Sequence, residues 1–177
     1  MKIRSLIILA ILAVGTSAMA QEGLKIGYTN VDYVLSLMPE TKQVEAEYNA
    51  YQQQIENQLQ SKITDFQTKG QQFQQQAATM TDLIRADKQA ELQALQASIE
   101  RFQRDAQGSL SKKQGDLFQP LFDKIGTAIN AVAEENAYTH VFSSGVPGMD
   151  ILLYATEEND ISDLILKKLG IDPPAEN

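Results

Sequence analysis

Apolar residues in the middle of the chain, from Glu40 to Gln119, stand singly in a polar, glutamine-rich background. Their steps of three, four or seven residues place them on one narrow stripe of a helix. Steps that alternate between three and four also keep a seam facing one partner helix, as in a coiled coil. The pattern therefore predicts two long helices folded back on each other. The first stripe contains Val44, Tyr48, Tyr51, Ile55, Leu59, Ile63, Phe66, Phe73, Ala77 and Met80, and the second contains Leu92, Leu95, Ile99, Phe102, Ala106 and Leu110.

The reversal between the two helices is predicted around residues 78–82. Thr81 or Asp82 can cap the descending helix there, because a short polar side chain accepts a hydrogen bond from a free backbone amide. At ~1.5 Å per residue, about 40 residues in each direction give a hairpin roughly 55 to 60 Å long. Such an arm projects from a body. Disorder, which glutamine-rich tracts also favour, fits poorly with a sustained helical stripe.

The two ends of the chain hold most of the other apolar residues, so we expect them to meet in one small body. Residues 24–29 alternate in polarity and predict a strand, after which Asn30 caps a short helix that Pro39 ends. Residues 138–143 and 151–155 are predicted as two strands of a β-hairpin. A last helix, capped by Asn159 or Asp160, ends before Gly170. The fold class is therefore α+β, with residues 40–118 as the arm and residues 21–39 and 119–177 as a three-stranded body.

A body of three short strands buries little by itself, so we expect the chain to oligomerise through it. The apolar residues of the predicted strands and of the first short helix are the candidates for the subunit contact. They are Ile26, Tyr28, Val31, Val34, Val141, Phe142, Ile151 and Leu153.

The junction of arm and body is interrupted by Gly108, Gly115 and Pro120. A proline inside a helix removes one hydrogen bond and clashes with the preceding turn, which predicts a bend or a break near residues 115–120. A continuous, gently kinked helix is the alternative.

Residues 1–20 have the plan of a secretory signal peptide. Lys2 and Arg4 precede an apolar run, and Ala18-Met19-Ala20 supplies the small residues for cleavage after Ala20. The apolar run is too short for a comfortable membrane span, which disfavours an uncleaved anchor. The chain has no cysteine, and so no disulfide framework.

Charge limits the partners of the mature chain. Removal of residues 1–20 leaves 13 basic against 23 acidic residues, a formal charge of −10. An acidic protein of this kind disfavours nucleic acid and anionic membrane surfaces as partners. The arm itself is nearly neutral, with nine basic and eleven acidic side chains.

The order of signal peptide, strand, short helix, glutamine-rich helical hairpin, strand pair and last helix resembles the Skp/OmpH family of periplasmic chaperones. The most specific segments are Lys25 to Val34 and Ile129 to Ser143. The resemblance implies a homotrimer whose three arms surround a cavity that holds unfolded outer-membrane β-barrel proteins without ATP. Better-known members are strongly basic, so membrane contact by the arm tips of this chain is doubtful. Candidate client-binding residues are Phe66, Phe73, Met80, Leu83, Ile84 and Phe102, of which the phenylalanines are expected mainly in the seam.

No motif in the chain supports catalysis, a cofactor or a metal site. The single histidine, His140, lies in a predicted strand and has neither cysteine nor an acidic cluster beside it. We therefore do not expect an enzyme. The alternative to a chaperone is a periplasmic coiled-coil adaptor whose hairpin docks onto one specific partner.

Overall fold

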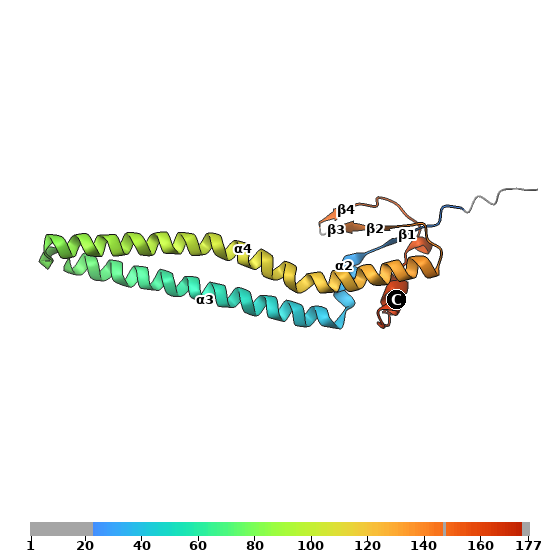
Figure 1. Cartoon of the computed structure of the whole chain (residues 1–177), viewed down its shortest axis with the longest axis horizontal. Coiled ribbons are helices and arrows are strands. Elements are labelled where there is room, and N and C mark those ends of the chain that lie inside the picture. The colour runs from blue at the N-terminus through green and yellow to red at the C-terminus, as the bar shows by residue number, and fades with distance from the viewer. Residues whose placement is uncertain (1–22, 147, 175–177) are drawn as a thin grey trace, which may run out of the picture.

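The structure is a computed structural model that describes residues 23–146 and 148–174, and it consists of a long helical arm on a small body (Figure 1). The residues predicted as a signal peptide lie outside the described residues. The arm is formed by α3 and most of α4, and both ends of the chain contribute to the body. In chain order the elements are β1 (Ile26–Thr29), α2 (Val31–Leu37), α3 (Pro39–Gln76), η1 (Ala77–Thr79), α4 (Asp82–Glu135), β2 (His140–Ser143), β3 (Gly145–Val146), β4 (Met149–Asp150), η2 (Glu157–Asn159) and α5 (Ser162–Lys168).

The helical hairpin agrees with the sequence pattern. Pro39 opens α3 at a position where its missing amide hydrogen costs nothing. The 38 residues of α3 correspond to a length of about 57 Å at ~1.5 Å per residue. At the far end a single 3₁₀ turn reverses the chain, and Thr81 Oγ1 accepts a 3.4 Å hydrogen bond from the amide of Ile84. The predicted reversal and the Thr81 cap are thus both present.

Helix α4 runs without a break through Gly115 and Pro120 into the body. The expected break is therefore wrong, whereas a bend is present, since Figure 1 shows the continuous α4 changing direction in its yellow part. Leu121 follows the proline directly and Ile125 lies one turn further on, and they are buried at 5% and 1% exposed. Because they are fixed in the core, the helix continues despite the lost hydrogen bond.

The predicted hairpin between residues 138–143 and 151–155 is wrong. β2 pairs in parallel with β1 from the other end of the chain, with Ile26 opposite His140 and Tyr28 opposite Phe142. Residues 151–155 form no strand, because the carbonyl of Ser144 accepts the amides of Ile151 and Leu152 and turns the chain there. In its place β3 and β4 form a ladder of two residue pairs, so the described residues contain two two-stranded sheets and the predicted three-stranded body is wrong. Parallel strands require a long crossover, which the arm provides here.

The core lies where α2, α4 and α5 meet beneath the β1–β2 sheet, so the two ends of the chain do form one body. Asp160 Oδ1 accepts the amide of Ser162 at 2.8 Å and starts α5, and Gly170 adopts φ 78° beyond its end. The hydroxyls of Thr29 and Ser162, both buried, lie 3.1 Å apart and join β1 to α5. The buried apolar residues of this core are Val34, Met38, Leu121, Ile125, Ala128, Val132, Ile161, Ile165 and Leu166.

The substitution Ile125→Ala should lower the free energy of unfolding by about 2 to 5 kcal/mol, because it leaves a cavity in this core. The matched change Ile84→Ala, at an arm residue that is 48% exposed, should cost only about 0.5 kcal/mol. Urea unfolding followed by circular dichroism at one fixed protein concentration measures both. Equal losses would contradict the placement of the core.

Candidate functional surfaces

The three phenylalanines proposed for client binding lie in the arm seam. Phe66 and Phe73 of α3 and Phe102 of α4 are each half-buried. The ammonium group of Lys62 lies 5.6 Å from the centre of the Phe102 ring, across the hairpin. Two helices alone cannot enclose such side chains, so each phenylalanine keeps one side in contact with solvent.

The other three candidates lie at the arm tip. Leu83 is 82% exposed and Ile84 is 48% exposed, whereas Met80 is half-buried. Leu83 and Ile84 are thus the most accessible of the six candidates. The structure brings Met80, Leu83 and Ile84 together around the reversal and leaves the phenylalanines spread along the arm.

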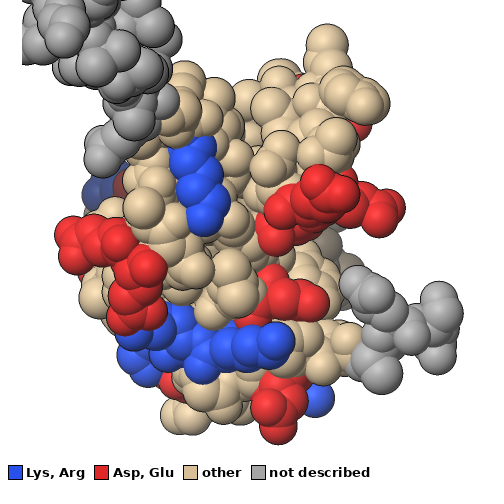
Figure 2. All heavy atoms as spheres, turned by 90° about the vertical axis from the view of Figure 1, so that its right-hand side faces the viewer, with Lys and Arg blue, Asp and Glu red and all other residues tan. Residues whose placement is uncertain are grey.

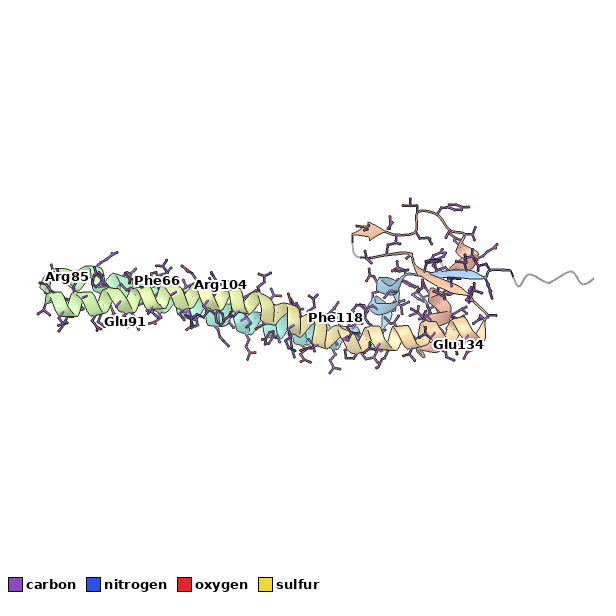
Figure 3. All side chains as sticks on the ribbon, turned by 45° about the horizontal axis from the view of Figure 1, so that its top comes forward. Phe66, Arg85, Glu91, Arg104, Phe118 and Glu134 are labelled. Carbon is purple, nitrogen blue, oxygen red and sulfur yellow. The ribbon has the colours of Figure 1, made fainter. Side chains whose placement is uncertain are left out.

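Arg85 stabilises the turn at the tip. Its guanidinium group donates to the carbonyl oxygens of Ala77 at 3.3 Å and Met80 at 3.2 Å, and it pairs with Asp82 at 3.3 Å. Figure 3 shows Arg85 at the free end of the arm, with Glu91 and Phe66 further back. Two carbonyl groups of the turn between α3 and α4 therefore gain a charged donor.

Glu91 is the centre of a charged cluster next to the tip. Its carboxylate accepts one 2.8 Å bond from Lys69 across the hairpin and another from Lys88 on its own helix. Lys69 also lies 3.4 Å from Asp65. The hydrogen bond from Lys69, followed by that from Lys88, lowers the pKa of Glu91 to about 2, and the same contact raises the pKa of Lys69.

Lysines bridge the two arm helices at several further points. Lys62 donates to the Ser98 hydroxyl at 3.3 Å, Lys113 pairs with Glu47, and Lys124 donates to Glu40 at 2.8 Å. The hydrogen bond from Lys124 lowers the pKa of Glu40. The same antiparallel alignment of the two helices therefore forms both these polar contacts and the apolar seam.

The outer face of the β1–β2 sheet is the main exposed apolar surface of the body. Gly27, Thr29 and Val141 point toward the core, so the alternate residues face outward. Gly27 packs closely on Tyr138, because a Cβ there would lie 3.0 Å from the Tyr138 ring and the ring would have to shift. The outward residues border a shallow hollow of about 290 Å³ whose lining includes Ile26, Tyr28, Phe142, Leu152 and Tyr154. We call these five residues the sheet surface.

The structure corrects part of the list of residues predicted for the subunit contact. Val34 is 0% exposed within the chain's own core and has no surface left for a partner, so its assignment is wrong. Val31 and Val141 are partly buried against the same core. Ile26, Phe142, Ile151 and Leu153 are 39%, 47%, 53% and 92% exposed.

Sequence reasoning missed Tyr154 and Met149, which are 83% and 66% exposed. The run Ile151-Leu152-Leu153-Tyr154 was a signal for an exposed apolar surface. A half-buried strand alternates apolar and polar residues, whereas this run has four consecutive apolar residues without helical neighbours. Figure 2, which views the body from its free end, shows few charged side chains in its upper part and clusters of both signs below.

The residues that the structure describes contain no group of three or more histidine, cysteine, aspartate or glutamate side chains that could hold a metal ion. The His140 ring lies 3.2 Å from the Thr139 hydroxyl and stacks on Phe142 with centroids 6.3 Å apart. In the same ranges, no helix is both long and apolar enough to cross a membrane.

The structure is thus a helical-hairpin arm on a small α+β body, and exposed apolar residues lie at the arm tip and on the sheet. The family model described as outer membrane protein (OmpH-like) matches residues 25–169. The chain therefore belongs to the OmpH-like family, as its resemblance to Skp/OmpH proteins indicated.

One solved structure supports the same fold. It is that of a candidate outer membrane chaperone (OmpH-like) from Caulobacter crescentus CB15, which superposes with a TM-score of 0.68 at 14% identity. The match covers 86% of this chain and 88% of the Caulobacter chain. Comparison with curated proteins gives no match.

The Glu91 carboxyl should titrate with a midpoint near 2 when followed by its side-chain ¹³C resonance. Because its pKa is depressed in the folded chain, its contribution to stability is present above its ordinary value of 4.5 and is lost as the pH falls toward 2. In Lys69→Met the midpoint should move back toward 4.5. A midpoint that does not change would show that Lys69 does not act on Glu91.

Proposed function

We propose that the protein is an ATP-independent chaperone of the periplasm that holds unfolded outer-membrane β-barrel proteins between the arms of a homotrimer. The observation that carries this proposal is the arm itself, in a chain of the OmpH-like family: its apolar stripe is half-buried along its length and ends in exposed Leu83 and Ile84. The description of the Caulobacter protein as a candidate outer membrane chaperone supports the same role.

Many weak contacts suit the retention of an unfolded chain. Half-buried aromatic side chains and Met80 offer apolar surface, and the abundant glutamines offer hydrogen bonds without charge. No single strong site is needed, because an unfolded client presents many short apolar segments. The nearly neutral arm implies that added salt does not weaken this grip.

The sheet surface is the proposed subunit contact. Large apolar side chains gather there and at the adjoining Ile151 and Leu153, whereas monomeric soluble proteins rarely expose a contiguous patch of this kind. The arm leads away from the body, so subunits joined through their bodies would place three arms around a shared space. An arm of about 57 Å could line a cavity for a whole client.

The periplasm is the proposed location. It rests on the family and on the signal-peptide plan of residues 1–20, with cleavage after Ala20 as the prediction. A soluble client-holding protein in that compartment has no ATP to use, which agrees with a grip built from passive contacts.

The second candidate function is that of an adaptor. Leu83 and Ile84 form a small exposed apolar knob at the arm tip, of the kind that could dock into one partner pocket. An adaptor would bind that partner at a fixed ratio and would not act on unrelated unfolded proteins.

The test of the chaperone proposal is light scattering as a urea-unfolded outer-membrane β-barrel is diluted into buffer without ATP. At about one trimer per client, aggregation of several unrelated β-barrels should be suppressed, and the suppression should persist when salt is added. The double variant Leu83→Gln with Ile84→Gln should weaken suppression only partly, since the rest of the arm still contacts the client. Failure of a folded, oligomeric sample to suppress any of them would favour the adaptor.

The substitution Phe142→Asp should dissociate the trimer, because three carboxylates would be buried in an apolar contact. Sedimentation velocity should then show monomers at concentrations where the parent chain is trimeric. Leu83→Asp is the matched control, since it places the same charge on an exposed apolar residue of the arm tip and should leave the trimer intact. A trimer that survives Phe142→Asp would exclude the sheet surface as the contact.

A further inference from the structure

The seam of the arm changes character near the tip. Further back, the half-buried seam residues of α4 are mostly apolar, such as Leu95, Ile99 and Phe102. Between residues 82 and 92, however, the half-buried positions of α4 are Arg85, Glu91 and Leu92, two of which are charged. From α4, Leu92 is therefore the one half-buried apolar residue in this stretch to pack against Phe73 and Met80 of the other side, so apolar packing between the last turns is thinner than further back.

Polar contacts replace that packing. Glu91 is the acceptor that connects α4 to Lys69 of α3, and Lys88 completes the cluster from the same side. Beside this cluster lies a small cavity of about 50 Å³, and its lining includes Phe73, Met80 and Leu92. The cavity is therefore lined by three apolar side chains of the tip region together with the charged side chains of Lys69, Lys88 and Glu91.

Such a region is a natural place for local opening. Segments with few buried apolar contacts open at a lower cost than the rest of a structure. An ion pair between partly exposed side chains is weak and is screened by salt, so it can break and reform readily. The low pKa of Glu91 keeps the carboxylate charged at any physiological pH, so ionic strength and competing polar groups would control the contact.

We propose that Glu91 is a latch, whose bond to Lys69 of α3 holds the arm tip closed over Phe73, Met80 and Leu92, while Lys88 supports the carboxylate from its own helix. When the bond to Lys69 breaks, the two helix ends separate and the three apolar side chains become accessible. The second part of the inference rests on the proposed function: the exposed side chains then contact the unfolded client. Glu91 acts in this scheme as a positioning residue, since its own carboxylate need not touch the client.

Hydrogen exchange of the full mature chain, measured by mass spectrometry without any client, tests the latch. In Glu91→Gln the amides of residues 73–92 should exchange about twofold to fivefold faster than in the parent chain, the range that a partly exposed ion pair supports. The parent chain in about 0.5 M salt should show the same change. Amides near the body should exchange at the rate of the parent chain at low salt, both in Glu91→Gln and in the parent chain at high salt.

Glu47→Gln is the matched control. It removes another ion pair between the arm helices, that with Lys113, at a level where the half-buried residues Val44, Tyr48 and Tyr51 fill the seam. It should leave exchange at the tip unchanged. Tip exchange in Glu91→Gln that equals the parent rate, or acceleration spread evenly along the arm, would overturn the latch.

The link to the client is tested separately by binding of a urea-unfolded β-barrel to the two variants and to the parent chain. Glu91→Gln should bind the client more tightly than the parent, and Glu47→Gln should not. Faster tip exchange without any gain in binding would overturn the client part of the inference and leave the latch standing. If the parent chain binds no client at all, the proposed function fails, while hydrogen exchange still decides whether Glu91 closes the tip.

Discussion

Two helices packed side by side can bury only the stripe that each turns toward the other, and the rest of this structure depends on that limit. Along the arm the apolar side chains of the two described stripes remain half-buried, and Ala106 alone among them is buried. Full burial is confined to the body, where three helices and a sheet converge. The chain therefore combines a fixed core with an arm whose apolar groups stay within reach of a partner.

The limits of sequence reasoning follow from which interactions are local. Helical periodicity and capping are encoded within a few residues, so the arm, the Thr81 cap and the short helix after Asn30 could all be predicted. Strand pairing is not local. Residues 138–143 have the same alternating pattern whether they pair with the next segment or with Ile26 to Thr29 at the other end of the chain. The nearest candidate was the wrong one.

Burial within a short helix was equally hard to predict. Val31 and Val34 are both valines and lie three residues apart, yet Val34 is fully buried while Val31 is only partly buried. The difference depends on where α5 packs, and α5 comes from the opposite end of the chain. The polar contacts at the tip could not be predicted either, because lysine and glutamate occur all along the arm and only the antiparallel register brings Lys69 to Glu91.

The two arm helices are joined to the body in different ways, and this determines how the arm is oriented. α3 is separated from α2 by the single residue Met38, which is extended and buried. α4, in contrast, passes into the body as one uninterrupted helix whose residues after Pro120 form much of the core. The direction of the arm is therefore set mainly by α4, and by its change of direction before the core (Figure 1). In an assembly joined through the bodies, that change of direction would set the spacing of the arm tips and so the width of the space between them.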